Sequence, residues 1–233
     1  MLSRIYDGLD ASEMLQEALL GDLGGRVALV SSFGAESVAL LKLVADIDRG
    51  TPVIFLDTEM LFEETLAYQV GVAAALRLGD VRIIHPDPRE VAENDPVGDL
   101  HQSDKDACCA LRKTAPLSRA LSGFDGWITG RKRYQGGARA SLPRFGTDAD
   151  GRLKLNPIAD WDAAQVSAFI DDHALPRHPL FAQGYPSIGC APCTSKVAPG
   201  EDARAGRWRG EDKSECGIHF DNGRLVRGVA PAA

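Results

Sequence analysis

The sequence predicts an α/β fold in which helices flank a doubly wound parallel sheet and an irregular C-terminal tail follows. Short apolar runs rich in β-branched residues alternate with segments whose apolar residues recur at helical spacing. Hydrophobic residues make up 44% of the 233 residues and charged residues 25%, which is enough for one well-packed domain. No apolar run is long enough to span a membrane. We therefore expect strands and helices joined by right-handed crossovers.

Four buried strands are expected, because four short apolar runs each end in small or polar residues. Helices are expected where apolar residues recur every three or four positions, as Val38, Leu41 and Ala45 do. Gly79 should end the second helix, Pro116 should bend or restart the third, and Asp160 should cap the fourth. The strands are at residues 27–31, 52–57, 81–84 and 126–130, with a short edge element at 153–158; the helices are at residues 36–48, 60–78, 104–121 and 161–172.

The C-terminal part of the chain differs in composition from the rest. Beyond His173 it is rich in proline, glycine and charge, so we expect an irregular segment that folds back across the core. We divide the chain into one domain at residues 1–195 and a functional tail at residues 196–233. In doubly wound sheets, ligands bind at the carboxyl ends of the strands. Here those ends are residues 31–37, 57–58 and 130–139.

The charge balance is acidic, with 33 Asp and Glu against 26 Lys and Arg and a net charge of −7. A general nucleic-acid binder has the opposite balance, so we expect no nucleic-acid partner. The N-terminus lacks the layout of a signal peptide, and we expect a cytoplasmic protein without a membrane partner. One stretch, residues 126–146, is nevertheless purely basic, which indicates either a local anion site or a solvated loop. Its cations are Arg131, Lys132, Arg133, Arg139 and Arg144.

Cysteines are the strongest chemical signal in this sequence. Cys108 and Cys109 are adjacent, and Cys190 and Cys193 form a C-x-x-C pair. Four thiolates suit an iron–sulfur cluster or a tetrahedral zinc ion, with a disulfide or chance clustering as further alternatives. Adjacent cysteines point their side chains apart, which favours the cluster over a single ion. The fifth thiol, Cys216, would remain outside such a site.

A loop rich in serine and glycine joins the first strand to the first helix. Its small residues would let an anion approach the backbone, and the N–H groups at the helix N-terminus would bind it. It lacks the G-K-[ST] ending of a Walker loop, and a simple tight turn is the alternative. The candidate anion-binding residues are Ser31, Ser32, Phe33, Gly34, Ala35, Glu36 and Ser37.

Further candidates lie near the cysteines and in the tail. Cys216 is a candidate nucleophile, provided that a cationic pocket lowers its pKa, and His219 could assist it. Lys113, Arg204 and Arg207 could supply that positive charge and bind oxyanions, although exposed charged residues are the ordinary alternative.

Four motifs together resemble the iron–sulfur branch of the phosphoadenylyl-sulfate reductase family, the assimilatory adenylyl-sulfate (APS) reductases. They are Cys-Cys-Ala-Leu-Arg-Lys at 108–113, Ser-Ile-Gly-Cys-Ala-Pro-Cys-Thr at 187–194, Gly-Arg-Trp at 206–208 and Glu-Cys-Gly-Ile-His at 215–219. The serine-rich loop is similar to the pyrophosphate loop of the adenosine-nucleotide α-hydrolase-like superfamily, with Glu36 where ATP-consuming members often have lysine. Family members often have glycine where Glu59 stands.

The resemblance implies a function and a role for each candidate. APS would be reduced to sulfite and AMP in sulfate assimilation, through S-sulfocysteine on Cys216. A separate thioredoxin or glutaredoxin would be the reductant. Whether the protein forms a homo-oligomer stays open. Cys108, Cys109, Cys190 and Cys193 would hold a [4Fe–4S] cluster; Lys113, Arg131, Arg139, Arg204 and Arg207 would bind the phosphosulfate; and Asp57 and Thr58 would lie beside the adenosine.

Three other functions stay open at this point. A 3′-phosphorylated substrate, alone or together with APS, is the nearest. A tRNA-thiolating ATP pyrophosphatase is a second alternative, although Glu36 and the acidic charge are evidence against it. The third is a zinc-stabilised binding module, in which Cys216 would be unreactive.

Overall fold

The fold is that of a computed structural model, which describes residues 6–21, 26–211, 213 and 215. Its centre is a six-stranded sheet in the order β3-β2-β1-β4-β6-β5. All neighbouring strands are parallel except β5 and β6. The strands are β1 (Val27–Val30), β2 (Val53–Leu56), β3 (Val81–Ile84), β4 (Gly126–Thr129), β5 (Phe145–Thr147) and β6 (Leu153–Leu155). The predicted doubly wound sheet is confirmed, because the strand order reverses between β1 and β4.

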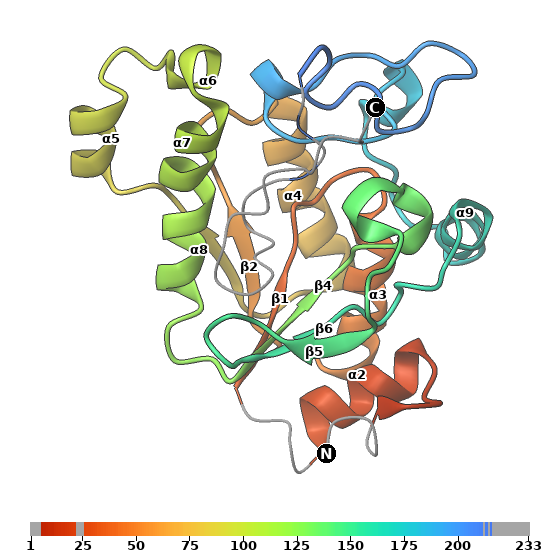
Figure 1. The fold of residues 1–233 in the computed structure, drawn as a ribbon. Helices are drawn as coiled ribbons and strands as arrows, with labels where there is room; N and C mark the ends of the chain where they lie inside the picture. The colour runs from red at the N-terminus through yellow and green to blue at the C-terminus, as the bar shows by residue number, and fades with distance from the viewer. Residues whose placement is uncertain (1–5, 22–25, 212, 214, 216–233) are drawn as a thin grey trace.

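Helices cover both faces of this sheet, as Figure 1 shows. One face packs against α2 (Ala11–Leu20), α3 (Ser37–Ile47), α4 (Glu63–Leu76) and α9 (Ala163–Asp172). The other face is covered by α8 (Ala115–Ala120). Three further short helices precede α8 on that side, namely α5 (Pro88–Asn94), α6 (Leu100–Ser103) and α7 (Lys105–Cys109).

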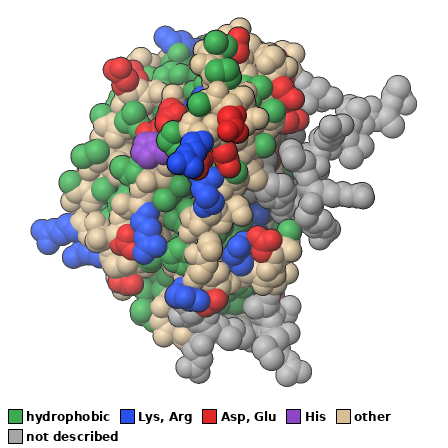
Figure 2. Space-filling model, turned by 90° about the vertical axis from the view of Figure 1, so that its left-hand side faces the viewer, with side chains coloured by type: hydrophobic (Ala, Val, Ile, Leu, Met, Phe, Trp, Pro, Cys, Tyr) green, Lys and Arg blue, Asp and Glu red, His purple; other side chains and the backbone are tan. Residues whose placement is uncertain are grey.

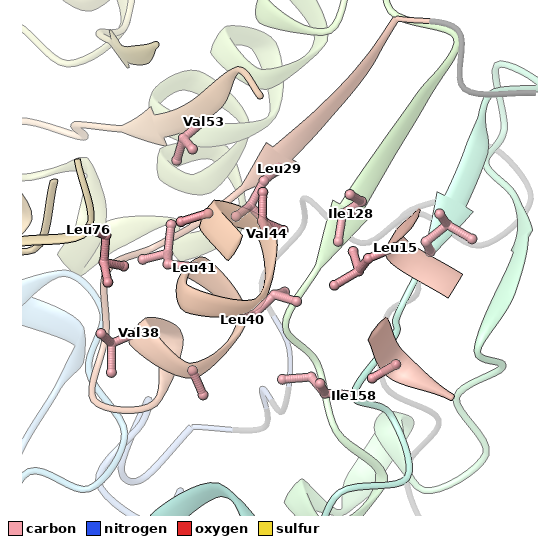
Figure 3. Packing of buried hydrophobic residues seen from close by; sticks show 14 of the residues in the cluster. Leu15, Leu29, Val38, Leu40, Leu41, Val44, Val53, Leu76, Ile128 and Ile158 are labelled. Carbon is pink, nitrogen blue, oxygen red and sulfur yellow. The ribbon is translucent and has the colours of Figure 1, made fainter. Parts of the chain in front are cut away.

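The main core lies between the sheet and α3. Leu29, Val53 and Ile128 point from three adjacent strands toward this helix, and Leu41 and Val44 meet them from its buried side (Figure 3). Neighbouring strand residues point the opposite way, so that Ala28, Ile54 and Trp127 form a second cluster with α8. Burial on both faces explains why the central strands are continuous apolar runs rather than alternating ones.

The surface on the side of α5–α8 carries interspersed acidic and basic side chains (Figure 2). No described helix is long and apolar enough to cross a membrane.

Several boundaries differ from those predicted. The helix α4 ends at Leu76 rather than at Gly79, because Arg77 takes the left-handed conformation with φ of 53°. Asp162, not Asp160, caps α9: its side chain accepts a hydrogen bond from the Gln165 N–H. Since sequence spacing leaves the first turn ambiguous, only this hydrogen bond identifies the cap.

The third predicted helix, residues 104–121, is interrupted. Between α7 and α8 the chain forms a π-helix at Ala110–Thr114, and Pro116 follows in the first turn of α8. A proline ring clashes with the carbonyl four residues earlier, and it offers no N–H group. Pro116 therefore coincides with the point where the regular helix resumes after the π-helix.

The sheet edge and the N-terminal region were also incompletely predicted. β6 is not an edge strand, because β5 pairs with it in antiparallel fashion and forms the edge. The helix α2 was not predicted, although Asp10 and Glu13 form a reciprocal capping box at its start. Beyond His173 the described chain is irregular, as expected, with short 3₁₀ turns at Phe181–Gln183 and Ala191–Cys193. The domain division at residue 195 stays a prediction.

Two valines of α4 test the contribution of this core. Val72 is 0% exposed and Val70 is 64% exposed in the same helix. Val72→Ala should lower the free energy of unfolding by about 2 kcal/mol, because it removes two buried methyl groups and leaves a cavity. Val70→Ala should change it by less than about 0.5 kcal/mol. Urea unfolding of both variants measures the difference; equal losses would contradict the assigned orientation of α4.

Candidate functional site

A cleft of about 250 Å³ lies at the carboxyl ends of β1 and β4. The blue C-terminal segment in Figure 1 lies across this end of the sheet. Most of the predicted substrate-binding residues line the cleft: Ser31, Ser32, Gly34, Ala35, Glu36, Ser37, Thr58, Lys113, Arg131, Arg139, Arg204 and Arg207. Phe33 and Asp57 do not line it. The ring of Phe33 is buried in the core, and the Asp57 carboxylate accepts a hydrogen bond from the Glu59 N–H at 2.9 Å.

The loop between β1 and α3 is held by its aromatic residue. Phe33 has a positive φ of 46°, and its ring meets that of Phe55 edge-on with centroids 5.2 Å apart. Two serine hydroxyls close the turn: Ser31 Oγ accepts from the Phe33 N–H at 3.2 Å, and Ser37 Oγ accepts from the Gly34 N–H at 3.0 Å. This anchoring holds the N-terminus of α3 at the cleft, where its positive dipole favours an anion.

The five cations of the basic stretch, residues 126–146, lie in two different surroundings. Arg131, Lys132 and Arg139 line the cleft. Arg133 and Arg144 instead form ion pairs with the carboxylate of Asp160. Three of the five cations of this stretch therefore face the cleft, and the anion site stays a prediction.

Lys132 is the most buried of these cations, at 2% exposure. Burial lowers its pKa, and the carboxylate of Glu36, 3.0 Å from Nζ, opposes that shift. The same carboxylate accepts hydrogen bonds from the hydroxyl of Tyr134 and from Nε2 of Gln135. Burial, and then Glu36, raise the pKa of Tyr134, which keeps its hydroxyl protonated. Tyr134 and Gln135 also line the cleft, and sequence reasoning did not single them out; Lys132 was noted only as one cation of the basic stretch.

The sequence contained a hint of a role in the cleft for Lys132 but none for Tyr134 and Gln135. Lys132 belongs to the basic stretch, so its charge was visible in the sequence. Nothing in the spacing of Tyr134 and Gln135 pointed to Glu36, which lies 98 and 99 residues away in the chain.

Two arginines of the cleft hold the last described residue of the tail. Arg139 donates to the Glu215 carboxylate from Nε at 2.5 Å and from Nη2 at 2.7 Å. Arg204 Nη2 lies 3.6 Å from the same carboxylate. Burial, and then the charge of Arg139, lower the pKa of Arg204 to about 10, so it stays cationic at neutral pH. This pair of guanidinium groups already binds an oxyanion. Cys216 and His219 lie outside the described residues.

Beside the cleft is a second, smaller cavity lined by Cys108, Cys109, Cys190 and Cys193. Elements far apart in the sequence bring these thiols together. Cys108 and Cys109 end α7, while Cys190 is held against the chain after β2 by a bridge to Leu61. Burial raises the pKa of Cys108 to about 11 and also raises that of Cys193. As they stand, the described His, Cys, Asp and Glu residues include no group of three that could hold a metal ion.

Polar groups support the thiol cavity. Thr58 Oγ1 lies 3.2 Å from Cys190 Sγ. Trp208 lines the cavity, and its backbone N–H donates to the Cys193 carbonyl at 3.1 Å. Thr194 pairs with Arg207, which connects the second cysteine loop directly to a cation of the cleft. Lys113 lines both the cleft and the thiol cavity and therefore lies between them.

A buried ion pair holds the first cysteine segment in place. Arg112 donates to the Asp95 carboxylate at 2.8 and 3.1 Å and to the Thr58 carbonyl at 3.1 Å. It also pairs with Glu59, whose φ of 60° is in the left-handed region that glycine adopts most easily. Burial raises the pKa of Asp95. The hydrogen bonds from the Leu100 N–H and from Arg112 outweigh this effect and hold that pKa below its usual range.

Comparison with known proteins identifies the family. A profile described as the phosphoadenosine phosphosulfate reductase domain matches residues 26–196. A protein of Mesorhizobium japonicum named adenosine 5'-phosphosulfate reductase is 47% identical over 220 residues, which cover 94% of this chain and 86% of the relative.

Solved structures agree with that result. A phosphoadenylyl-sulfate reductase from Candida auris, in complex with phosphate, superposes with a TM-score of 0.71 at 28% identity, covering 84% of this chain and 94% of the other. A yeast FAD synthetase shares the fold alone, with a TM-score of 0.55 at 15% identity, covering 80% of this chain and 66% of the other. The resemblance seen in the four motifs is confirmed, and the chain belongs to the phosphoadenosine phosphosulfate reductase family.

Proposed function

We propose that this protein reduces APS to sulfite and AMP in sulfate assimilation, with a thioredoxin or glutaredoxin as electron donor. The observation that carries the proposal is the 47% identity, over nearly the whole chain, to a relative named for this activity. The cleft supports it, because Arg139, Arg204 and Arg207 line it together with the first residues of α3. A nucleotide that ends in two linked oxyanions is complementary to such a surface.

The first step we propose is nucleophilic. The thiolate of Cys216 attacks the sulfur of APS, the bond between that sulfur and the phosphate oxygen breaks, and AMP leaves with the bonding electrons. Two anions 4 Å apart repel each other by about 4 kcal/mol at an effective dielectric constant of 20. Fixed cations around the reacting atoms would overcome that repulsion. Glu215, the residue before Cys216 in the sequence, contacts both Arg139 and Arg204, which supports Cys216 as the nucleophile of this proposal.

The second step we propose regenerates the enzyme. A donor thiolate attacks Sγ of the S-sulfocysteine and expels sulfite, which takes the electron pair of the sulfur–sulfur bond. The second donor thiol then attacks the resulting mixed disulfide and releases Cys216 as a thiolate. The donor becomes a disulfide, and the two electrons it loses are those that convert the sulfuryl group to sulfite. In this scheme residues 196–233 act as the tail that presents Cys216.

We also propose that the thiol cavity holds a [4Fe–4S] cluster. The donor set fits, because four cysteines from two segments line one enclosed space. Lys105, Arg112 and Lys113 line the same space and would offset the negative charge of four thiolates. Such a cluster would supply a fixed negative charge and a cross-link between the two cysteine segments. Lys113 would then be held between it and the substrate.

The proposed function is tested by incubating the anaerobically purified protein with APS, thioredoxin and a thioredoxin-reducing system. Equal amounts of AMP and sulfite are expected. The same assay with phosphoadenylyl sulfate, the substrate in the name of the Candida auris relative, measures the preference between the two. Absence of product from both substrates would overturn the proposal.

The cluster is tested by a substitution in the second cysteine loop. Native protein should contain about four iron and four sulfide per chain. Cys190→Ser should lose most of both, because one thiolate ligand is replaced by a hydroxyl. Ala191→Ser, which adds the same hydroxyl next to the ligand, is the matched control and should retain them. Iron and sulfide analysis decides, and an unchanged content in Cys190→Ser would contradict the assignment.

A further inference from the structure

Gln135 connects two charged groups of the cleft that do not touch each other. Its Nε2 donates to Glu36 at 3.1 Å, and its Oε1 accepts from Nη1 of Arg139. The Lys132 backbone N–H also donates to Oε1, at 3.2 Å. A single half-buried amide therefore lies between the first residue before α3 and the arginine that binds the tail.

These partners leave the amide one orientation. A carboxylate can only accept hydrogen bonds, and a guanidinium can only donate them. The nitrogen of Gln135 must therefore face Glu36, and its oxygen must face Arg139. Glu36 is itself held by Lys132 and by the hydroxyl of Tyr134, so the amide is anchored to a rigid group.

The orientation of Gln135 determines which edge of Arg139 is presented to a ligand. Gln135 occupies Nη1, whereas Nε and Nη2 form the fork that binds both carboxylate oxygens of Glu215. That fork is the edge with which arginine binds carboxylate or phosphate in a bidentate manner. Without Gln135, the guanidinium would rotate more freely and would lose part of this preorganisation.

We propose that Gln135 is a positioning residue: oriented by Glu36, it holds Arg139 so that the Nε–Nη2 edge faces an oxyanion in the cleft. In catalysis this inference rests on the proposed function, because the oxyanion would be the phosphosulfate of APS. Although Gln135 lines the cleft, its proposed effect on the substrate is exerted through Arg139.

The test is a double-mutant cycle in the full-length, anaerobically purified protein. Gln135→Met keeps the length of the side chain and removes its three hydrogen bonds, to Glu36, Arg139 and the Lys132 N–H; it should raise KM for APS about 10-fold. Arg139→Met should raise KM about 100-fold. The double variant should resemble Arg139→Met alone, because a residue that acts through Arg139 has nothing left to position. Gln16→Met, at an exposed position of α2, is the control and should leave KM unchanged.

Two results separate this role from a merely structural one. If Gln135→Met raised KM by the same factor with and without Arg139, or lowered the unfolding midpoint without changing KM, the inference would be overturned.

A second measurement separates the inference from the proposed function. Native protein, Gln135→Met, Arg139→Met and the double variant are titrated with inorganic pyrophosphate by calorimetry, which requires no turnover. Coupling between Gln135 and Arg139 in the Kd for pyrophosphate, together with no product from APS, would leave the inference standing and reject the proposed function. Additive changes in Kd would overturn the inference, whatever the enzyme assay shows.

Discussion

Cys216→Ser is expected to abolish reduction of APS, with a loss in kcat of roughly 10⁶-fold, the scale observed when a covalent nucleophile is removed. A hydroxyl is not ionised near neutral pH, whereas a thiol in a cationic setting is readily ionised. Cys216 follows Glu215, whose carboxylate is bound by Arg139 and lies near Arg204. These arginines would stabilise both the thiolate and the approaching sulfuryl group.

The measurement is a single turnover with APS in the absence of any dithiol, followed by intact mass. Native protein should gain the mass of one SO₃ group and lose it when thioredoxin is added. Cys216→Ser should gain nothing while retaining the iron content of the native protein. An adduct of the same mass on the serine variant would place the nucleophile elsewhere in the chain.

Asp95→Asn is expected to lower the free energy of unfolding by about 3 to 5 kcal/mol, because it removes the buried carboxylate that balances the buried charge of Arg112. The side chain of Asp95 is 0% exposed and that of Arg112 is 6% exposed. Glu59→Gln is the matched control, since it removes the other carboxylate that pairs with Arg112. The Glu59 side chain is 47% exposed, so this change should lower stability by about 0 to 1 kcal/mol.

The pH dependence of this effect follows from the direction of the Asp95 shift. Its folded-state pKa is lowered, so the pair contributes its stability above the unfolded value of about 3.9 and loses it as the pH falls through the folded value. Urea unfolding should show the full difference between native protein and Asp95→Asn near neutral pH and a shrinking one in acid. A difference that stayed constant down to the most acidic pH would contradict the ion-pair explanation.

The strands were predictable because their signal is local. Each central strand is buried on both faces, so its residues form a continuous apolar run that needs no knowledge of its neighbours. β5 was missed for the opposite reason. It is short and lies at an edge, and its partner β6 decides its conformation. The π segment before Pro116 was missed because a proline predicts a defect in a helix but not the way the chain accommodates it.

The sequence by itself determined the fold class and the chemical groups available: four paired cysteines, a cluster of arginines and a loop suited to anions. Only the tertiary structure decided how these groups are used. It directs Arg133 and Arg144 toward Asp160 and away from the cleft, and it makes Lys113 a wall of two cavities. The physical reason is the range of the interactions. Periodicity and spacing record local hydrogen bonding and burial, whereas the pairing of Glu36 with Gln135 joins residues 99 positions apart and exists only once the elements are packed.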